Sequence, residues 1–450
     1  MSSLKHVAEL IKKNKITEVE CLFPTINATL RGKLMRAHDF AEGKELRIAR
    51  AVILQTINGE YCDDHVIGAT DNDTILKPDY STFKILPWQP QRAWVLHDCM
   101  NFDGSPSEHA PRNVLKKVLA QYQTLGLQPV VAPEIEFYLF KRDGQEAAGF
   151  TPPAMRGGSI ELERQMAYSL NSTAEMRDFW QALQAAFDAL EIRTDTWLHE
   201  MAPNQFEINL LHGNALKLAD DVVLFKHTLR EIAAQHGLNA VFMAKPLADY
   251  DGSSMHLHQS IVDAKGNNIF SDATSNNIGN ATPEFYAYIA GLQNYMADLM
   301  PLMAPYFNSW RRYALGTQAP VNLQWGHDNR TIGLRVPHSV AAARRVENRF
   351  AGSDANPYLA MATSLACGLR GMQEKLKPTA PVDDKDGYEF PREIAIGLES
   401  AITQLKQSKS AREMFGNEFI DAFCNVKEIE LAHFMYEVSS WDRRYLALQV

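Results

Sequence analysis

The chain has 450 residues, of which 46% are hydrophobic and 22% charged, and its formal net charge is −9. This balance is typical of a globular protein with more than one domain, and it excludes a membrane protein, because no apolar run is long enough for a span. An acidic chain also lacks the basic surface that nucleic acid requires. Five scattered cysteines without a CxxC pair argue against both a disulfide framework and a zinc site.

The N-terminal part of the chain, residues 1–105, predicts a small domain. Its first residues form a polar amphipathic stretch instead of a signal peptide, so we expect a cytoplasmic protein. A helix is expected near Leu4–Lys13, followed by short apolar runs at Val19–Phe23, Ala51–Leu54 and Ala93–His97. A stretch rich in Gly, Ser and Pro at 103–107 is typical of a linker.

Residues 106–450 predict a larger domain in which helices and strands alternate. A helix starts at Pro111, and a strand follows at Pro129–Phe140. Further helices are expected at Ala174–Leu190, Leu216–His236, Pro283–Met303, Pro357–Leu376 and Arg392–Leu405. Further strands are expected at Phe206–Leu210, Val241–Lys245, Met255–Ile261, Ile332–Val336 and Arg345–Phe350. The mixture favours an α+β fold on an antiparallel sheet.

Acidic residues recur at strand spacing in two of these segments. Glu134 and Glu136 are two residues apart and therefore share one face of a strand. Neighbouring carboxylates repel unless a cation lies between them, so the pair indicates either a metal site or a solvated sheet face. Glu207 lies on a later strand, and Glu200 precedes it in a loop that either folds back to the same cation or is simply exposed.

The sequence also contains a histidine pair and an arginine cluster. His256, His258 and Ser260 share one strand face, where an imidazole is a candidate metal ligand. Arginines surround Glu347 at positions 330, 335, 345 and 349, and Arg312 lies upstream. So many guanidinium groups around one acid favour binding of phosphate and carboxylate.

Together these residues predict phosphoryl transfer supported by divalent cations. Carboxylate oxygens with one imidazole suit Mg²⁺ or Mn²⁺ better than zinc. Cations and guanidinium groups neutralise the charge that develops when a phosphoryl group moves. The chain has neither a Walker A loop nor a GxGxxG motif, so ATP must be held in another way.

Six motifs in a fixed order resemble the glutamine synthetase family across essentially the whole chain. They are PEIEF at 133–137, HEMAPNQFE at 199–207, GSSMHLHQS at 252–260, NRTIGLRVP at 329–337, ARRVENRF at 343–350 and DANPYLA at 354–360. The resemblance implies a small N-terminal β-grasp domain over residues 1–105. It also implies a catalytic domain over residues 106–450 with a curved antiparallel sheet.

The resemblance implies a role for each matching residue. Two or three Mg²⁺ or Mn²⁺ ions are expected per site, one held by Glu136, Glu200 and Glu207 and another by Glu134, His256 and Glu347. The expected ATP contacts are His258, Ser260, Arg335 and Arg345, and the expected glutamate contacts are Gly252, Arg312 and Arg349. Arg330 is expected to stabilise the transferring phosphoryl group, with Glu347 and Gln318 also placed at the catalytic centre.

The implied activity is an ATP-dependent ligase that forms γ-glutamyl phosphate from L-glutamate and passes the γ-glutamyl group to an amine. The sequence departs from glutamine synthetases at Gln318, where the family has a glutamate that binds and deprotonates ammonium. The family's Asp-Gly-Ser-Ser motif is also missing from residues 51–59. These departures resemble the γ-glutamylpolyamine synthetase branch, which includes γ-glutamylputrescine synthetase, and predict a primary amine such as putrescine or spermidine as acceptor.

Several alternatives and details stay open in the sequence. The alternative function is glutamine synthetase itself, using ammonium, and an inactive paralogue is disfavoured by the intact acids. Glu60, Asp63 and Asp64 are candidates for binding the far amine of a diamine. The resemblance also implies a homododecamer of two hexameric rings with active sites between subunits. Tyr388 resembles a tyrosine that is modified in some relatives, but we interpret it as a loop anchor.

Overall fold

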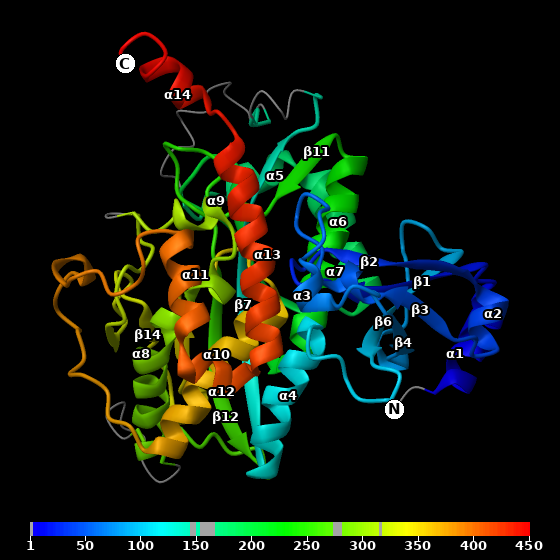
Figure 1. Ribbon diagram of the computed structural model, residues 1–450, viewed down its shortest axis with the longest axis horizontal. Helices are drawn as coiled ribbons and strands as arrows, with labels where there is room; N and C mark the ends of the chain where they lie inside the picture. The colour runs from blue at the N-terminus through cyan, green and yellow to red at the C-terminus, as the bar shows by residue number, and fades with distance from the viewer. Residues whose placement is uncertain (1–2, 145–149, 154–166, 273–280, 315–316) are drawn as a thin grey trace.

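Two separate β-sheets organise the chain (Figure 1). The computed structural model describes residues 3–144, 150–153, 167–272, 281–314 and 317–450. The first sheet and its helices form the blue unit at one side of the molecule, while α13 lies across the larger unit and α14, near the end of the chain, projects from it. No helix in these ranges combines the length and the apolar character that a membrane span needs.

The first sheet has six strands within residues 18–100, in the order β2-β1-β6-β4-β3, with β5 also paired to β6. The neighbours β1 and β6 are parallel, and the other pairs are antiparallel. Helix α1 (Leu4–Asn14) buries Val7 and Ile11 against this sheet. The strands are β1 (Glu18–Pro24), β2 (Leu30–Arg36), β3 (Leu46–Ala49), β4 (Asp73–Pro78), β5 (Lys84–Ile85) and β6 (Arg92–Met100).

The second sheet has nine strands, seven of them in the order β13-β14-β15-β12-β7-β9-β8, while β10 and β11 both pair with β7. Every pair is antiparallel except β13–β14, which is parallel, so the predicted antiparallel sheet needs this one correction. The strands are β7 (Leu127–Lys141), β8 (Thr194–His199), β9 (Gln205–Leu210), β10 (Gly213–Asn214), β11 (Leu238–Val241), β12 (Met255–Asp263), β13 (Trp325–His327), β14 (Leu334–Val336) and β15 (Val346–Asn348).

Long helices cover one face of the second sheet and form the main apolar core with it. Gly291 of α8 and Gly371 of α10 let these two helices approach until an added Cβ would lie 2.1–2.2 Å from a backbone oxygen of the other helix. The longer helices are α4 (Pro111–Thr124), α6 (Arg177–Leu190), α7 (Ala215–Gln235), α8 (Pro283–Met303), α10 (Pro357–Glu374), α11 (Leu398–Gln407) and α13 (Asn417–Tyr436). The short ones are α2 (Ala37–Ala41), α3 (Asp64–Ile67), α5 (Leu170–Glu175), α9 (Phe307–Trp310), α12 (Lys409–Phe415) and α14 (Ser440–Tyr445).

The predicted α+β class is confirmed, but several predicted boundaries are wrong. The helix expected at Ala174–Leu190 is two helices, α5 and α6, and the apolar run Ala51–Leu54 lies in a 3₁₀ helix instead of a strand. The strand expected at Val241–Lys245 ends at Val241, and the helix expected from Arg392 begins only at Leu398. Tertiary contacts explain the last difference, because the Arg392 side chain and the Glu393 backbone bond to Tyr313 and Val321.

A buried arginine at the start of α4 links the two sheets. Arg112, whose side chain is 2% exposed, donates to Asp220 of α7, to Asp98 of β6 and to Asp79. It therefore joins the first sheet to the helix layer of the second. The predicted division of the chain near residue 105 lies between the two sheets and stays a prediction.

We expect Arg112→Met to destabilise the protein by about 3–5 kcal/mol, because the variant leaves buried carboxylates without their cation. The measurement is urea unfolding followed by tryptophan fluorescence. The control is Arg47→Met, which removes an exposed pair with Glu45 and should cost less than about 1 kcal/mol. Equal losses in the two variants would contradict the linking role of Arg112.

Candidate active site

The register of four neighbouring strands brings the predicted acids and histidines together. Glu136 of β7 lies opposite Glu207 of β9, and Glu134 of β7 lies opposite His256 of β12. On the next strand along, Glu347 of β15 lies opposite His258 of β12. Motifs that are more than 200 residues apart in the chain, from PEIEF to ARRVENRF, therefore share one surface of the sheet.

The first group of potential metal ligands is the one expected from the sequence. One oxygen each of Glu136, Glu200 and Glu207 lies within 4.8 Å of the others. Glu200 reaches this group because residues 200–204 form the tight turn between β8 and β9, closed by the Glu200 amide, which donates to the Gln205 carbonyl at 2.8 Å. The loop therefore folds back, as one of the two interpretations of the sequence expected.

The second group contains His258, and His256 lies beside it. Ligand atoms of Glu134, His258 and Glu347 lie within 4.8 Å of one another. His256, the histidine that the sequence assigned, has its Nδ1 3.5 Å from oxygens of both Glu134 and Glu347. His258 Nε2 is closer, 2.7 Å from Glu134 Oε1. Both imidazoles thus lie beside these acids, and the choice of His256 as the ligand stays a prediction.

Two residues that we did not single out hold Glu136 in place. Ser254 donates to this carboxylate through its backbone N–H at 2.8 Å and through its hydroxyl at 2.5 Å. Gln205 Nε2 lies 3.4 Å from Glu136 Oε2 and donates to the Gly252 carbonyl at 2.9 Å. Both lie inside quoted motifs, but only the tertiary structure shows which acid they contact.

The acids of the first group disfavour one another's charge. Burial, followed by repulsion from Glu136, raises the pKa of Glu200 to about 7. Burial and the charges of Glu134, Glu136 and Glu200 raise the pKa of Glu207 well above its usual range. Carboxylates crowded in this way are the donor set that a divalent cation stabilises, so the residues fit Mg²⁺ or Mn²⁺.

The negative charges of the acids in the second group are balanced by arginine and histidine side chains. Burial works to raise the pKa of Glu347, but the charge of Arg349 and of the histidines lowers it to about 2. Glu134 behaves alike, because hydrogen bonds from His256 and His258 outweigh burial and lower its pKa. Glu347 is also held by Arg335 and Arg349, each with an NH1 nitrogen 2.7 Å from one of its oxygens.

Two adjoining cavities divide the predicted substrate contacts. A polar cavity of about 630 Å³ is lined by the first acid group, by Glu134 and His256, and by the predicted residues Gly252, Arg312, Gln318, Arg330, Arg335 and Arg349. A second cavity of about 320 Å³ is lined by His258, Ser260 and Arg345, and it shares Glu134 and Asn209 with the first. Three of the four predicted ATP contacts therefore lie together, while Arg335 lines the other cavity.

The arginines that line the polar cavity differ in how far their guanidinium groups are already hydrogen-bonded within the protein. Arg312 donates to the backbone carbonyls of Arg349 and Phe350 at 3.0 and 3.1 Å, so part of its hydrogen-bonding capacity is structural. Arg330 lines the cavity as an exposed side chain close enough to Glu200 to lower the pKa of that carboxyl. Its position fits a guanidinium that meets an incoming anion.

The segment around Gln318 forms one wall of the polar cavity. Gln318 has a φ of 58°, which is uncommon for a residue other than glycine, and its carbonyl lies 3.4 Å from Arg349 NH2. Tyr388 donates its hydroxyl to the neighbouring Ala319 carbonyl at 3.0 Å, consistent with a loop anchor. Gln318 contributes an uncharged amide to this wall, at the position where the sequence resemblance implies a glutamate in glutamine synthetases.

The loop at residues 56–64 lies outside both cavities of its own chain. Asp63 is bonded by Asn425 of α13, whose side-chain oxygen accepts from the Asp63 amide and whose Nδ2 donates to the Asp63 carboxylate. Glu60 and Asp64 are exposed. None of the three candidate residues for a diamine therefore contacts the active site of the same chain.

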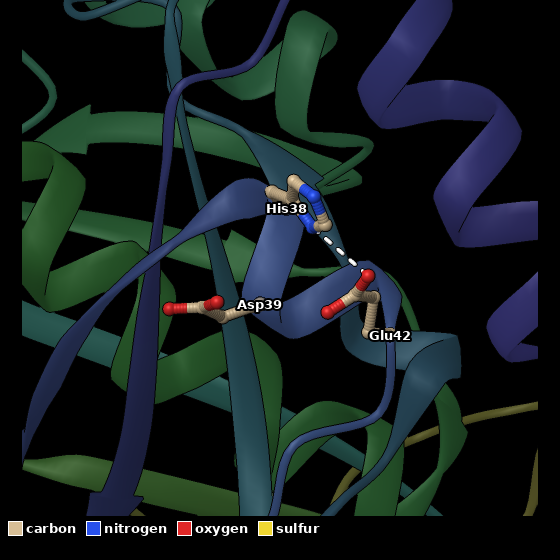
Figure 2. Close-up of side chains that lie close together, drawn as sticks. All are labelled: His38, Asp39 and Glu42. Atoms are coloured by element: carbon tan, nitrogen blue, oxygen red, sulfur yellow. Dashed lines mark ion pairs between the residues drawn. The ribbon is translucent and has the colours of Figure 1, made fainter.

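A third acidic group has the composition of a metal site but not its surroundings (Figure 2). His38 and Asp39 lie on the five-residue helix α2 and Glu42 is its C-cap residue, with His38 Nδ1 3.4 Å from Glu42 Oε1. The His38 and Glu42 side chains are largely exposed, so the pair is an ordinary contact between successive helical turns. We assign no cation to it.

Two acid groups on one sheet, beside a cavity lined by four arginines, fit an enzyme that binds divalent cations and anionic substrates. The family model for the glutamine synthetase catalytic domain matches residues 108–446. The chain therefore belongs to the glutamine synthetase family.

Relatives within this family act on different amines, to judge by their names. A glutamate–isopropylamine ligase from Pseudomonas sp is 33% identical over 98% of this chain and 97% of its own length. The γ-glutamylputrescine synthetase PuuA of Escherichia coli is 35% identical over 74% of this chain and 70% of its own. A glutamine synthetase of Methanococcus maripaludis is 30% identical over the full length of both chains.

Solved structures confirm the predicted glutamine synthetase-like fold. A GmaS complex with ADP superposes with a TM-score of 0.86 at 27% identity, covering 99% of this chain and 100% of that one. GmaS without ligand gives a TM-score of 0.84 over 98% of this chain.

The raised pKa of Glu200 predicts that cation binding depends on pH. A protonated carboxyl does not bind a cation, so Mn²⁺ affinity should rise with pH through about 7, by about tenfold per pH unit for each proton released. Titration of the nucleotide-free protein with Mn²⁺ at several pH values measures this effect. Glu200→Gln should bind Mn²⁺ more weakly and with less pH dependence, whereas a pH-independent wild-type affinity would refute the coupling.

Proposed function

We propose that the protein activates the γ-carboxylate of L-glutamate with ATP and joins it to a primary amine. The observation that carries this proposal is the combination of complete cation and anion sets with an uncharged Gln318 at the cavity wall. Two of the relatives are named as ligases of glutamate and an organic amine, which supports the proposal.

The proposed reaction has two steps. A γ-carboxylate oxygen of glutamate forms a bond to the γ-phosphorus of ATP while the bond to the β,γ-bridging oxygen breaks, and ADP leaves. The amine nitrogen then bonds to the γ-carbonyl carbon, the carbon–oxygen bond to phosphate breaks, and the amine loses a proton. The products are ADP, phosphate and a γ-glutamylamide.

Some residues of the site are proposed to neutralise charge, and others are proposed to hold the substrates in position. Bound Mg²⁺ or Mn²⁺, held by the two acid groups, would neutralise the phosphate oxygens and polarise the phosphorus. Arg330, an exposed guanidinium facing the same cavity, is placed to stabilise the transferring phosphoryl group. Arg349 and Gly252 are proposed to hold glutamate, and the cavity with His258, Ser260 and Arg345 is proposed to hold ATP.

An organic amine is favoured over ammonium by the chemistry of the cavity wall. Ammonium is a small cation that gains most from carboxylates around it, and Gln318 offers only a neutral amide oxygen. A larger amine makes up for this loss through contacts of its carbon chain. We propose a polyamine such as putrescine or spermidine, which would place the enzyme in polyamine catabolism.

Assembly and location are part of the same proposal. We propose a cytoplasmic homododecamer of two hexameric rings with active sites between subunits. The exposed acids Glu60 and Asp64, which lie outside the cavities of their own chain, are available to a neighbouring subunit in such an assembly.

The acceptor is tested by phosphate release with glutamate and ATP and one amine at a time. The amines are ammonium, methylamine, ethanolamine, isopropylamine, putrescine and spermidine. We expect kcat/KM for putrescine or spermidine to exceed that for ammonium by about tenfold or more. Ammonium as the best acceptor would refute the proposal in favour of a glutamine synthetase, and isopropylamine as the best would refute the polyamine.

The role of Gln318 is tested by restoring the acid. We expect Gln318→Glu to raise kcat/KM for ammonium by about tenfold, because a carboxylate stabilises the small cation at this wall. Gln318→Ala serves as the control and should not raise it. An unchanged preference in the Glu variant would show that residue 318 does not select the acceptor.

A further inference from the structure

A buried hydroxyl lies directly behind the second acid group. Side chains alternate along a strand, so Gln259 and Asn348, which follow His258 and Glu347, point away from the cavity and toward α10. Ser364 of α10 accepts a hydrogen bond from each of them, at 2.6 Å from Gln259 Nε2 and at 2.8 Å from Asn348 Nδ2. All three residues are at most 1% exposed. One oxygen atom thus joins the strands that carry His258 and Glu347.

The strand that carries Glu347 is short, and hydrogen bonds just beyond its end also hold it. β15 is three residues long and is paired with β12 at three positions and with β14 at two. Beyond it, the Arg349 amide donates to the Gly333 carbonyl and the Met255 amide donates to the Ala351 carbonyl. Each backbone hydrogen bond contributes only about 0.5–1.5 kcal/mol. The bridge through Ser364 therefore adds a second connection between β12 and β15, on the face opposite the acids.

The bridge itself is anchored to rigid helices. Tyr288 of α8 donates its hydroxyl to Gln259 Oε1 at 2.6 Å, which fixes the orientation of that amide. The Tyr288 ring lies so close to Gly368 of α10 that an added Cβ would be 2.1 Å from it. Ser364 therefore lies on a helix that packs closely against α8.

We propose that Ser364 is a positioning residue of the cation site. It acts through Gln259 and Asn348 to set the distance between Glu347 on β15 and the histidines on β12, and it touches neither cation nor substrate. Removal of its oxygen leaves two buried amide N–H groups without an acceptor, which favours a shift of β15 that restores their hydrogen bonds. The inference rests on the cation site of the proposed function.

The test is Mn²⁺ binding by the full-length protein without nucleotide, measured by electron paramagnetic resonance well below the unfolding temperature. We expect Ser364→Ala to weaken Mn²⁺ binding by about tenfold or more and to raise the KM for ATP. Ser364→Cys keeps the size and a weaker acceptor, so its affinity should lie between those of the wild type and the Ala variant. It also replaces the Ala variant if that variant does not fold.

Thr363 supplies a matched control on the same helix. It is equally buried, and its hydroxyl has no hydrogen-bond partner among the described residues. Thr363→Ala should leave Mn²⁺ affinity unchanged, whatever its effect on stability. Wild-type affinity in both Ser364 variants, or an equal loss in Thr363→Ala, would overturn the positioning role. A wild-type protein that binds no Mn²⁺ would instead refute the cation site on which the proposed function depends.

Discussion

Mutual repulsion among five buried or half-buried carboxylates is the constraint on which this site depends. Glu134, Glu136, Glu200, Glu207 and Glu347 lie on the three strands β7, β9 and β15 and in the turn between β8 and β9, and burial makes each charge more costly than in water. A protein keeps such a set together only if other groups oppose the repulsion. The fold supplies part of that opposition, and the remainder fits divalent cations.

The two acid groups differ in how far the protein itself compensates them. Glu347 sits between Arg335 and Arg349, and Glu134 is bonded by histidine, so the pKa values of both are lowered. Glu200 and Glu207 have no such partners, and their pKa values are raised. The first acid group therefore gains more from a bound cation, and its occupancy is coupled to protons, whereas the second is close to charge balance before any ligand arrives.

The rest of the fold holds these strands at fixed positions. Helices α8 and α10 pack closely behind the sheet. Ser254 donates to the Glu136 carboxylate, and Ser364 of α10 accepts a hydrogen bond from Asn348, the residue after Glu347. Arg112 joins the first sheet to the same helix layer, so the two sheets do not move independently. A phosphoryl-transfer site needs such rigidity, because misplacement of a group by about 1 Å costs much of the rate.

The sequence by itself determined which residues are candidates for the chemistry. Spacing of two places Glu134 beside Glu136 and His256 beside His258, because a strand turns alternate side chains to the same face, and this holds whatever the strand pairs with. It did not determine the register between strands, which set Glu136 opposite Glu207 and Glu347 opposite His258. It left Glu200 open, because the turn that returns it is closed by a backbone hydrogen bond. Only the tertiary structure decided that both imidazoles lie beside Glu134 and that Ser364 stands behind them, because such contacts depend on how distant segments pack.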